Sequence, residues 1–188
     1  GGLWSGILRI DVDNNPALSA PIARQPKEAA QINSSLTSLL NPRPLTWPAS
    51  STQGYSIPLD NPFRTTAPAG GGQAPTLGEF YAIGLRHPWS ISQDPVTGHI
   101  WYADVGEDQR EEIGRIVKGG NHQWGFKEGS DFNGPIAQPA SVLGTSTAPV
   151  LDYSHVVGKA VIGAGVYRGS LFPELQGKFL FSDFNDGQ

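Results

Sequence analysis

Apolar and polar residues alternate over short distances through much of the second half of the chain. This period of two is typical of half-buried β-strands, and turn-forming residues lie between the runs. The predicted strands cover residues 80–85, 89–92, 99–105 and 112–117, with turns at 94–98 and 118–121. Strands joined by such short connections indicate an antiparallel meander.

A faint internal repeat supports an architecture built from similar units. Residues 98–105 and 177–184 share the order Gly, polar, apolar, apolar, aromatic, small, Asp, apolar. An arginine precedes each copy, Arg86 for the first and Arg168 for the second. The spacing between the two copies of the repeat suits one β-propeller blade of about 40 to 50 residues plus an insertion. A chance match in a glycine-rich β protein is the alternative.

The N-terminal segment 3–13 predicts a strand that ends in an Asp/Asn turn at 13–16. Asp11, Asp13 and Asn14 also suggest a calcium loop. The central glycine and closing glutamate of an EF-hand are missing, so the turn is the favoured interpretation.

Residues 16–76 are rich in Pro, Ser, Ala and Thr and poor in large apolar side chains. One short helix is predicted over 27–40, and the Pro residues that follow it would end the helix. We expect residues 16–54 to form an irregular insertion in a single partial propeller domain that covers residues 1–188, since long structureless loops are unusual in compact domains.

Composition favours turns over charged helices. The 188 residues include 24 Gly and 16 Pro, and only 16% are charged, against about 25% in an average domain. A formal net charge of −4 argues against a nucleic-acid partner. The absence of cysteine excludes disulfides and thiol catalysis, and no apolar run is long enough for a transmembrane helix.

Several motifs, met in one order, resemble those of a known family. They lie at residues 57–63, 81–89, 104–108, 111–113, 118–125 and 165–169. The chain resembles the glucose/sorbosone dehydrogenase-like family of soluble quinoprotein sugar dehydrogenases, which includes aldose sugar dehydrogenases and the propeller of Hedgehog-interacting proteins. The resemblance covers most of the chain outside the insertion. It implies an all-β, six-bladed antiparallel propeller, of which about three blades lie in this chain.

The resemblance also implies a cofactor, pyrroloquinoline quinone (PQQ), bound with Ca²⁺. By motif, Arg86, His87 and Arg168 are the expected PQQ contacts. PQQ is a planar polyanion, and the guanidinium group offers a rigid fork of donors for it. His87 stands where the enzymes usually carry Asn. The alternatives are a surface position for Arg86 and a pair with a blade aspartate for Arg168.

Two calcium positions follow from the same motifs. Backbone carbonyls of Gly106 and Glu107 are expected at the cofactor calcium, because Ca²⁺ selects hard oxygen donors. Glu112 and the carbonyl of His122 match a second, structural calcium. His122 replaces a usual aromatic residue, and Gln123 replaces a usual glycine. A solvated acidic turn is the alternative interpretation of Asp108, Glu111 and Glu112.

No catalytic residue is predicted. The family's enzymes use a histidine base in an early blade, and none of His87, His99, His122 and His155 falls in that motif. We therefore expect a fragment of a longer enzyme, completed by further blades of its parent chain.

The predicted function is PQQ- and calcium-dependent oxidation of an aldose at C1 to the lactone. The expected partners are a sugar substrate and an external electron acceptor, in the periplasm or outside the cell. One alternative is a non-catalytic propeller that binds a protein or a glycan, as in Hedgehog-interacting proteins. Another is a structural β module of a large secreted protein.

Overall fold

The computed structural model describes residues 5–20, 55–64, 77–131, 136–138 and 140–185. These residues divide into a smaller unit within Leu8–Phe80 and a larger unit within Trp4–Ile7 and Tyr81–Gln188. The predicted helix at 27–40 and all but the first residues of the predicted insertion at 16–54 lie outside the described residues.

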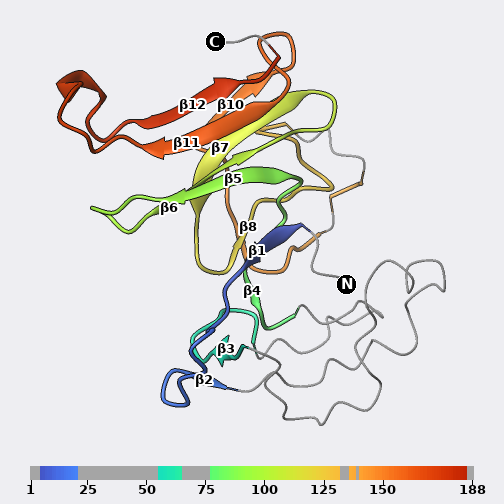
Figure 1. Ribbon diagram of the computed structural model, residues 1–188. Coiled ribbons are helices and arrows are strands. Elements are labelled where there is room, and N and C mark those ends of the chain that lie inside the picture. The colour runs from blue at the N-terminus through green and yellow to red at the C-terminus, as the bar shows by residue number, and fades with distance from the viewer. Residues whose placement is uncertain (1–4, 21–54, 65–76, 132–135, 139, 186–188) are drawn as a thin grey trace, which may run out of the picture. The chain divides into compact units, whose positions relative to one another are not determined.

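The centre of the larger unit is a four-stranded antiparallel sheet in the order β10-β7-β6-β5 (Figure 1). Its strands are β5 (Pro88–Gln93), β6 (Ile100–Asp104), β7 (Arg110–Ile116) and β10 (Leu151–Ser154). Three of these match predicted runs, and they follow one another as a meander. The predicted meander is therefore confirmed from β5 onward.

The sheet has two apolar faces, as period-two alternation requires. Tyr102 and Ile116 lie on one face and contact Ala82 and Leu85. Ala103 and Ile113 lie on the other face and contact Val161 of the next hairpin. Burial on both sides explains why β6 and β7 contain few exposed positions.

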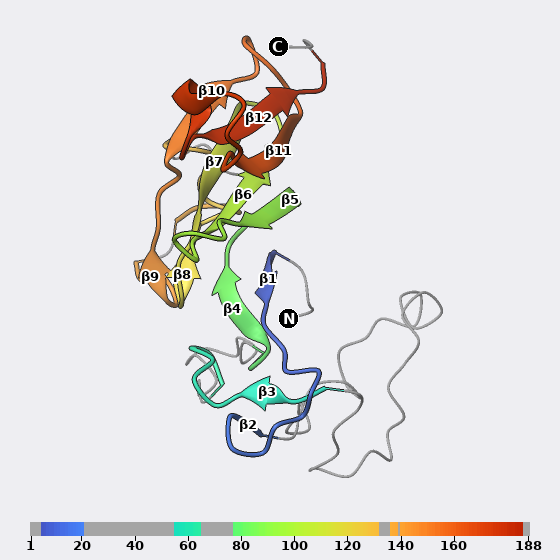
Figure 2. The same cartoon turned by 60° about the vertical axis from the view of Figure 1, so that its left-hand side comes forward.

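That next hairpin consists of β11 (Val161–Val166) and β12 (Phe179–Asp183), with the short 3₁₀ helix η1 (Pro173–Leu175) between them. Its first strand lies against the sheet, where the Gly163 amide donates to the Ser90 hydroxyl at 2.8 Å. Figure 2 shows the hairpin beside β5 and β6. Both copies of the sequence repeat form the second strand of an antiparallel hairpin, β6 and β12.

Residues 80–85 do not continue the meander. β4 (Phe80–Ile83) belongs to a second sheet, ordered β1-β4-β8-β9, and pairs in parallel with β8 (Gly120–Asn121). The outer strands are β1 (Gly6–Leu8) and β9 (Thr145–Ser146). The expectation that 80–85 pairs with the following strand is wrong because Gly84, at a φ of 76°, turns the chain between the sheets.

In the smaller unit, β2 (Ser19–Ala20) pairs with β3 (Ile57–Pro58), and Asp11 forms a bridge with Ser56. The Asp11 carboxylate accepts the amides of Asp13 and Asn15, each at 2.9 Å. These bonds make the segment an Asx turn, which confirms the turn interpretation.

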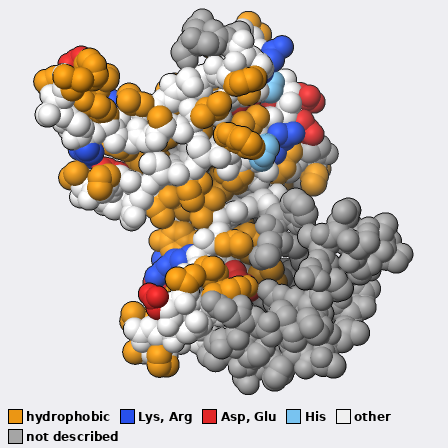
Figure 3. Space-filling view, in the orientation of Figure 1, with side chains coloured by type: hydrophobic (Ala, Val, Ile, Leu, Met, Phe, Trp, Pro, Cys, Tyr) orange, Lys and Arg blue, Asp and Glu red, His pale blue; other side chains and the backbone are white. Residues whose placement is uncertain are grey.

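Large apolar side chains remain exposed on the larger unit, including those of Trp89, Ile91, Leu171 and Phe184. Figure 3 shows apolar side chains scattered over the face that it presents. Among the described residues, no helix has the length and hydropathy needed to span a membrane.

Candidate functional site

One end of the central sheet, where β6 ends and β5 begins, gathers most of the predicted site residues. The Asp104 carboxylate, which is buried, accepts the backbone amides of Arg86 at 2.8 Å and His87 at 2.5 Å. Burial raises the pKa of Asp104 to about 7, although the two amide bonds oppose that shift. These two hydrogen bonds to the aspartate, which we call the clasp, fix the Arg86 backbone at this end of the sheet.

The Arg86 guanidinium group has two contacts here. Nη1 donates to the Val105 carbonyl at 3.1 Å, and the group lies 5.4 Å from the centre of the Trp124 ring. The Trp124 amide in turn donates to the Gly84 carbonyl at 2.7 Å. Within the described part of the chain Arg86 forms no ion pair or hydrogen bond with a carboxylate, although its charge acts to lower the pKa of Asp104, so donors of its planar fork remain for an anion.

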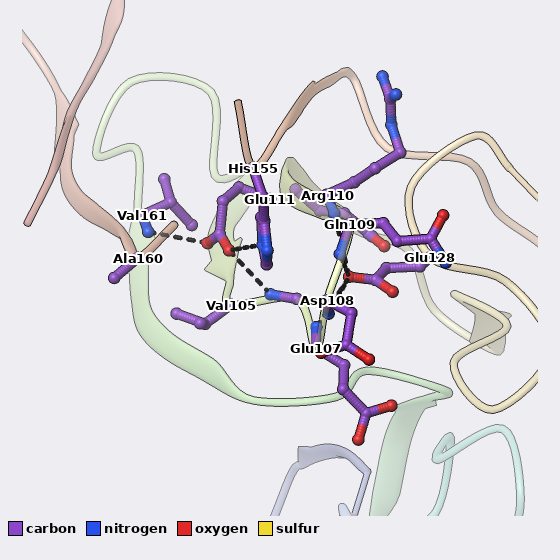
Figure 4. A network of polar contacts seen from close by, with 12 residues as sticks. Val105, Glu107, Asp108, Gln109, Arg110, Glu111, Glu128, His155, Ala160 and Val161 are labelled. Carbon is purple, nitrogen blue, oxygen red and sulfur yellow. Dashed lines mark hydrogen bonds and ion pairs between the residues drawn. The ribbon is translucent and has the colours of Figure 1, made fainter. Parts of the chain in front are cut away.

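The loop between β6 and β7 is built around a carboxylate from a distant segment. Glu128, 2% exposed, accepts four consecutive backbone amides at Oε1, as Figure 4 shows. Those amides belong to Glu107 at 2.8 Å, Asp108 at 3.1 Å, Gln109 at 2.9 Å and Arg110 at 3.0 Å. Burial alone would raise the pKa of Glu128, but the four bonds outweigh it and lower the pKa below its ordinary value.

Gly106 begins this loop and has no room for a side chain. A Cβ there would overlap the Arg110 carbonyl oxygen and approach Glu128 Oε1 to 2.6 Å. A glycine is thus required by close approach of the backbone, as the resemblance implied for a metal-binding peptide. Within the described residues, the carbonyl oxygens of Gly106 and Glu107 accept no hydrogen bond.

Glu111 supports the loop from another direction. Its fully buried carboxylate accepts the Gly106 amide at 3.3 Å and the Val161 amide at 2.8 Å, and lies 2.7 Å from His155 Nε2. Figure 4 shows this group and Glu128 on different sides of the loop. Neither Glu111 nor Glu112 is part of a solvated acidic turn, since both are buried in β7.

Three carboxylates lie in a row across the sheet. Asp104, Glu112 and Asp152 occupy opposed positions on β6, β7 and β10. Arg110 Nε donates to Asp152 at 2.5 Å, whereas Glu112 accepts the Gly129 amide at 2.6 Å. Burial, followed by the charge of Asp104, raises the pKa of Glu112 to about 8. Opposed like charges are unfavourable, so a cation beside Glu112 would relieve this row.

His122 lies on the same face. Its Nδ1 is 3.1 Å from the Tyr102 hydroxyl, its Nε2 is buried without a hydrogen-bond partner, and burial lowers its pKa to about 4. The next residue, Gln123, has a φ of 71°. That left-handed conformation favours glycine, which is the residue the resemblance leads one to expect there.

Arg168 is not brought to this end of the sheet. Its guanidinium forms a two-pronged ion pair with Asp94, with Nε–Oδ1 at 2.9 Å and Nη2–Oδ2 at 2.6 Å. Asp94 follows the last residue of β5, whereas Arg86 precedes the first. The length of β5 alone separates these ends by about 17 Å. The pair favours the structural alternative left open for Arg168, and its cofactor role stays a prediction.

Sequence reasoning missed Glu128, Trp124 and the pair of Glu111 with His155. Trp124 stood in a recognised motif, but no pattern marked Glu128, because its partners lie about twenty residues away in the chain. In the described part of the chain, no three His, Asp or Glu side chains form a group that could hold a metal ion.

Comparison with known proteins identifies relatives across most of the chain. The family model described as glucose/sorbosone dehydrogenase matches residues 51–187. HIPL1 protein of Arabidopsis thaliana is 34% identical over 96% of this chain and 23% of its own length. Aldose sugar dehydrogenase YliI of Escherichia coli is 28% identical over 72% of this chain and 35% of its own length. The chain thus spans about a quarter to a third of these relatives.

Among solved structures, the soluble aldose sugar dehydrogenase of Escherichia coli in its apo form superposes with a TM-score of 0.52 and 27% identity. The match covers 70% of this chain and 36% of that one. A structure described as a glucose dehydrogenase gives a TM-score of 0.50 at 26% identity, over 71% and 36% of the two chains. The predicted all-β propeller fold is confirmed, with no α-helix among the described residues.

Proposed function

Because the chain belongs to the glucose/sorbosone dehydrogenase family, we propose that its protein oxidises an aldose at C1 to the lactone with PQQ and Ca²⁺. The electrons pass to an external acceptor, in the periplasm or outside the cell. The observation that carries this proposal is the Arg86 guanidinium, held at the end of β5 without a carboxylate partner among the described residues.

In this proposal, Arg86 and His87 bind the anionic groups of the cofactor. Asp104 orients both residues by accepting their amides, which leaves the two side chains available for the ligand. Binding of a carboxylate by a preoriented guanidinium group is stronger than by a mobile one, since less side-chain entropy is lost.

The residues present also fit calcium. The Gly106 and Glu107 carbonyls are hard oxygen donors on a loop whose glycine cannot be replaced without a clash. For a structural calcium, the Glu112 carboxylate and the His122 carbonyl remain the proposed ligands, and the crowding of carboxylates around Glu112 supports a cation there.

When bound, PQQ supplies a quinone that accepts a hydride from the sugar carbon. This chain's residues contribute binding and orientation to that reaction. A general base must also remove the hydroxyl proton. We assign no catalytic residue to this chain, because none of its four histidines falls in the motif that carries the family's base. Two of them also have other contacts, since His155 is paired with Glu111 and His122 is buried against Tyr102.

The test adds PQQ and Ca²⁺ to the full-length protein and follows dye reduction with a panel of aldoses, together with PQQ binding by calorimetry. We expect saturable binding and sugar-dependent reduction. A folded protein that binds no PQQ at any calcium concentration would exclude the proposal.

A non-catalytic propeller that binds a protein or a glycan is the second candidate. It is supported by the similarity to HIPL1 protein, which extends over 96% of this chain. The same experiment separates the two, because the second candidate predicts neither quinone binding nor dye reduction.

A further inference from the structure

Resting on the proposed function, we propose that Glu128 is a positioning residue for the cation-binding face of the 106–110 loop. Four successive amides that point to one side form an anion-binding nest, a feature that in many proteins holds a phosphate or carboxylate ligand. Here the nest is filled by the protein's own Glu128 carboxylate, which is 2% exposed. An external anion therefore has no access to these amides.

The side of the loop opposite Glu128 presents carbonyl oxygens instead of amides. In a trans peptide the carbonyl points away from the amide of the next residue, and the described chain contains no cis peptide bond. The carbonyls of residues 106–109 thus point away from Glu128. In agreement with this direction, the partner of the Gln109 carbonyl comes from another segment, since it accepts the His155 amide at 2.7 Å.

Glu128 thereby turns the Gly106 and Glu107 carbonyls outward and adds a negative charge behind them. Both effects favour a cation over an anion at this face. Glu111 cannot replace it, because Glu111 binds only the Gly106 amide of this loop. Positioning partners that lie outside the metal ligands affect metal affinity strongly in other proteins.

The experiment compares Glu128→Gln with Asp183→Asn in the full-length protein. Asp183 is a suitable control, because it is also a buried carboxylate with backbone amide partners, and no bond joins it to the loop. The readout is the Ca²⁺ concentration that gives half-maximal PQQ binding in calorimetry, alongside the thermal melt without calcium. Glu128→Gln should raise that concentration about 10- to 100-fold, whereas Asp183→Asn should lower only the melting temperature.

Equal calcium requirements for the two variants, with Glu128→Gln merely less stable, would overturn the assignment. If Glu128→Gln does not fold, Glu128→Asp retains the charge on a shorter side chain and should give a smaller increase in the calcium requirement. Amide hydrogen exchange at residues 107–110 gives a ligand-free readout, which should accelerate in the Glu128 variants alone. If the wild type shows no calcium-dependent PQQ binding, both the proposed function and this cation role are overturned. If amide hydrogen exchange at residues 107–110 is unchanged in the Glu128 variants, the positioning of the loop by Glu128 is itself overturned.

Discussion

The β5–β6 and β11–β12 hairpins carry the same sequence repeat but differ in what surrounds its aspartate. Asp104 ends β6 opposite Pro88, and Asp183 ends β12 opposite Val161. Each carboxylate accepts a backbone amide from just before its hairpin's first strand, that of His87 in one and Ala160 in the other. The repeat therefore encodes a clasp that closes the open end of a hairpin.

The difference lies in the residues added to that clasp. Asp183 also accepts the Tyr153 hydroxyl at 2.8 Å, and these bonds lower its pKa even though burial alone would raise it. Among the described residues no hydroxyl donates to Asp104, and the charge of Arg86 acts to lower its pKa instead. Similar strand ends thus have a hydroxyl donor beside the aspartate in one hairpin and, beside the other, an arginine to which the proposed function gives a ligand.

The largest expected effect separates the two arginines. Arg86→Ala should weaken PQQ binding about 10- to 100-fold, because a hydrogen bond to a charged group contributes about 1.5–3 kcal/mol. Calorimetry with PQQ at saturating Ca²⁺ measures the change. Arg86 has no carboxylate partner among the described residues, so the melting temperature should change little.

Arg168→Ala is the matched control. It removes the pair with Asp94 and should lower the melting temperature while PQQ affinity stays near that of the wild type. A large loss of PQQ affinity in Arg168→Ala would instead establish the cofactor role that the resemblance implied for it.

A smaller effect concerns the turn of the first hairpin. The Arg168 guanidinium holds the pKa of Asp94 well below its ordinary value of 3.8, so this pair stabilises the fold above that value. The contribution is lost as the pH falls through the lower pKa of the folded state. Asp94→Asn should lower the melting temperature near pH 7 by about 2–4 °C.

The pH dependence is the sharper part of that prediction. The difference in melting temperature between wild type and Asp94→Asn should begin to shrink below about pH 3.8, where Asp94 of the unfolded chain takes up a proton, and should continue to shrink until the pH passes the lower pKa of the folded state. A difference that stays constant from neutral to acid pH would show that the ion pair contributes nothing.

The strands of the meander could be predicted because alternation and short turns are local, whereas the propeller fold was implied by the sequence repeat and by the resemblance of several ordered motifs to a known family. The repeated aspartate was visible in the sequence, but its hydrogen bonds to backbone amides were not predicted. The placement of Arg168 was not predictable. Its distance from Arg86 depends on its pairing with Asp94 after the end of β5, whereas Arg86 lies before the start of that strand. The hydrogen bonds from the loop amides to Glu128 join segments about twenty residues apart in the chain, and no sequence spacing predicts such a contact.

The smallest expected effect tests whether Trp124 holds Arg86 in place. A cation over an indole ring contributes about 0.5–1 kcal/mol, so Trp124→Leu should weaken PQQ binding about two- to fivefold by calorimetry. Trp101→Leu is the control, because Trp101 also lies under an arginine, Arg115, at 6.0 Å, and stacks on Phe179. Arg115 faces Trp101 near the opposite end of β6. Both variants should lose stability, and equal PQQ affinities in the two would show that the Trp124 contact orients nothing.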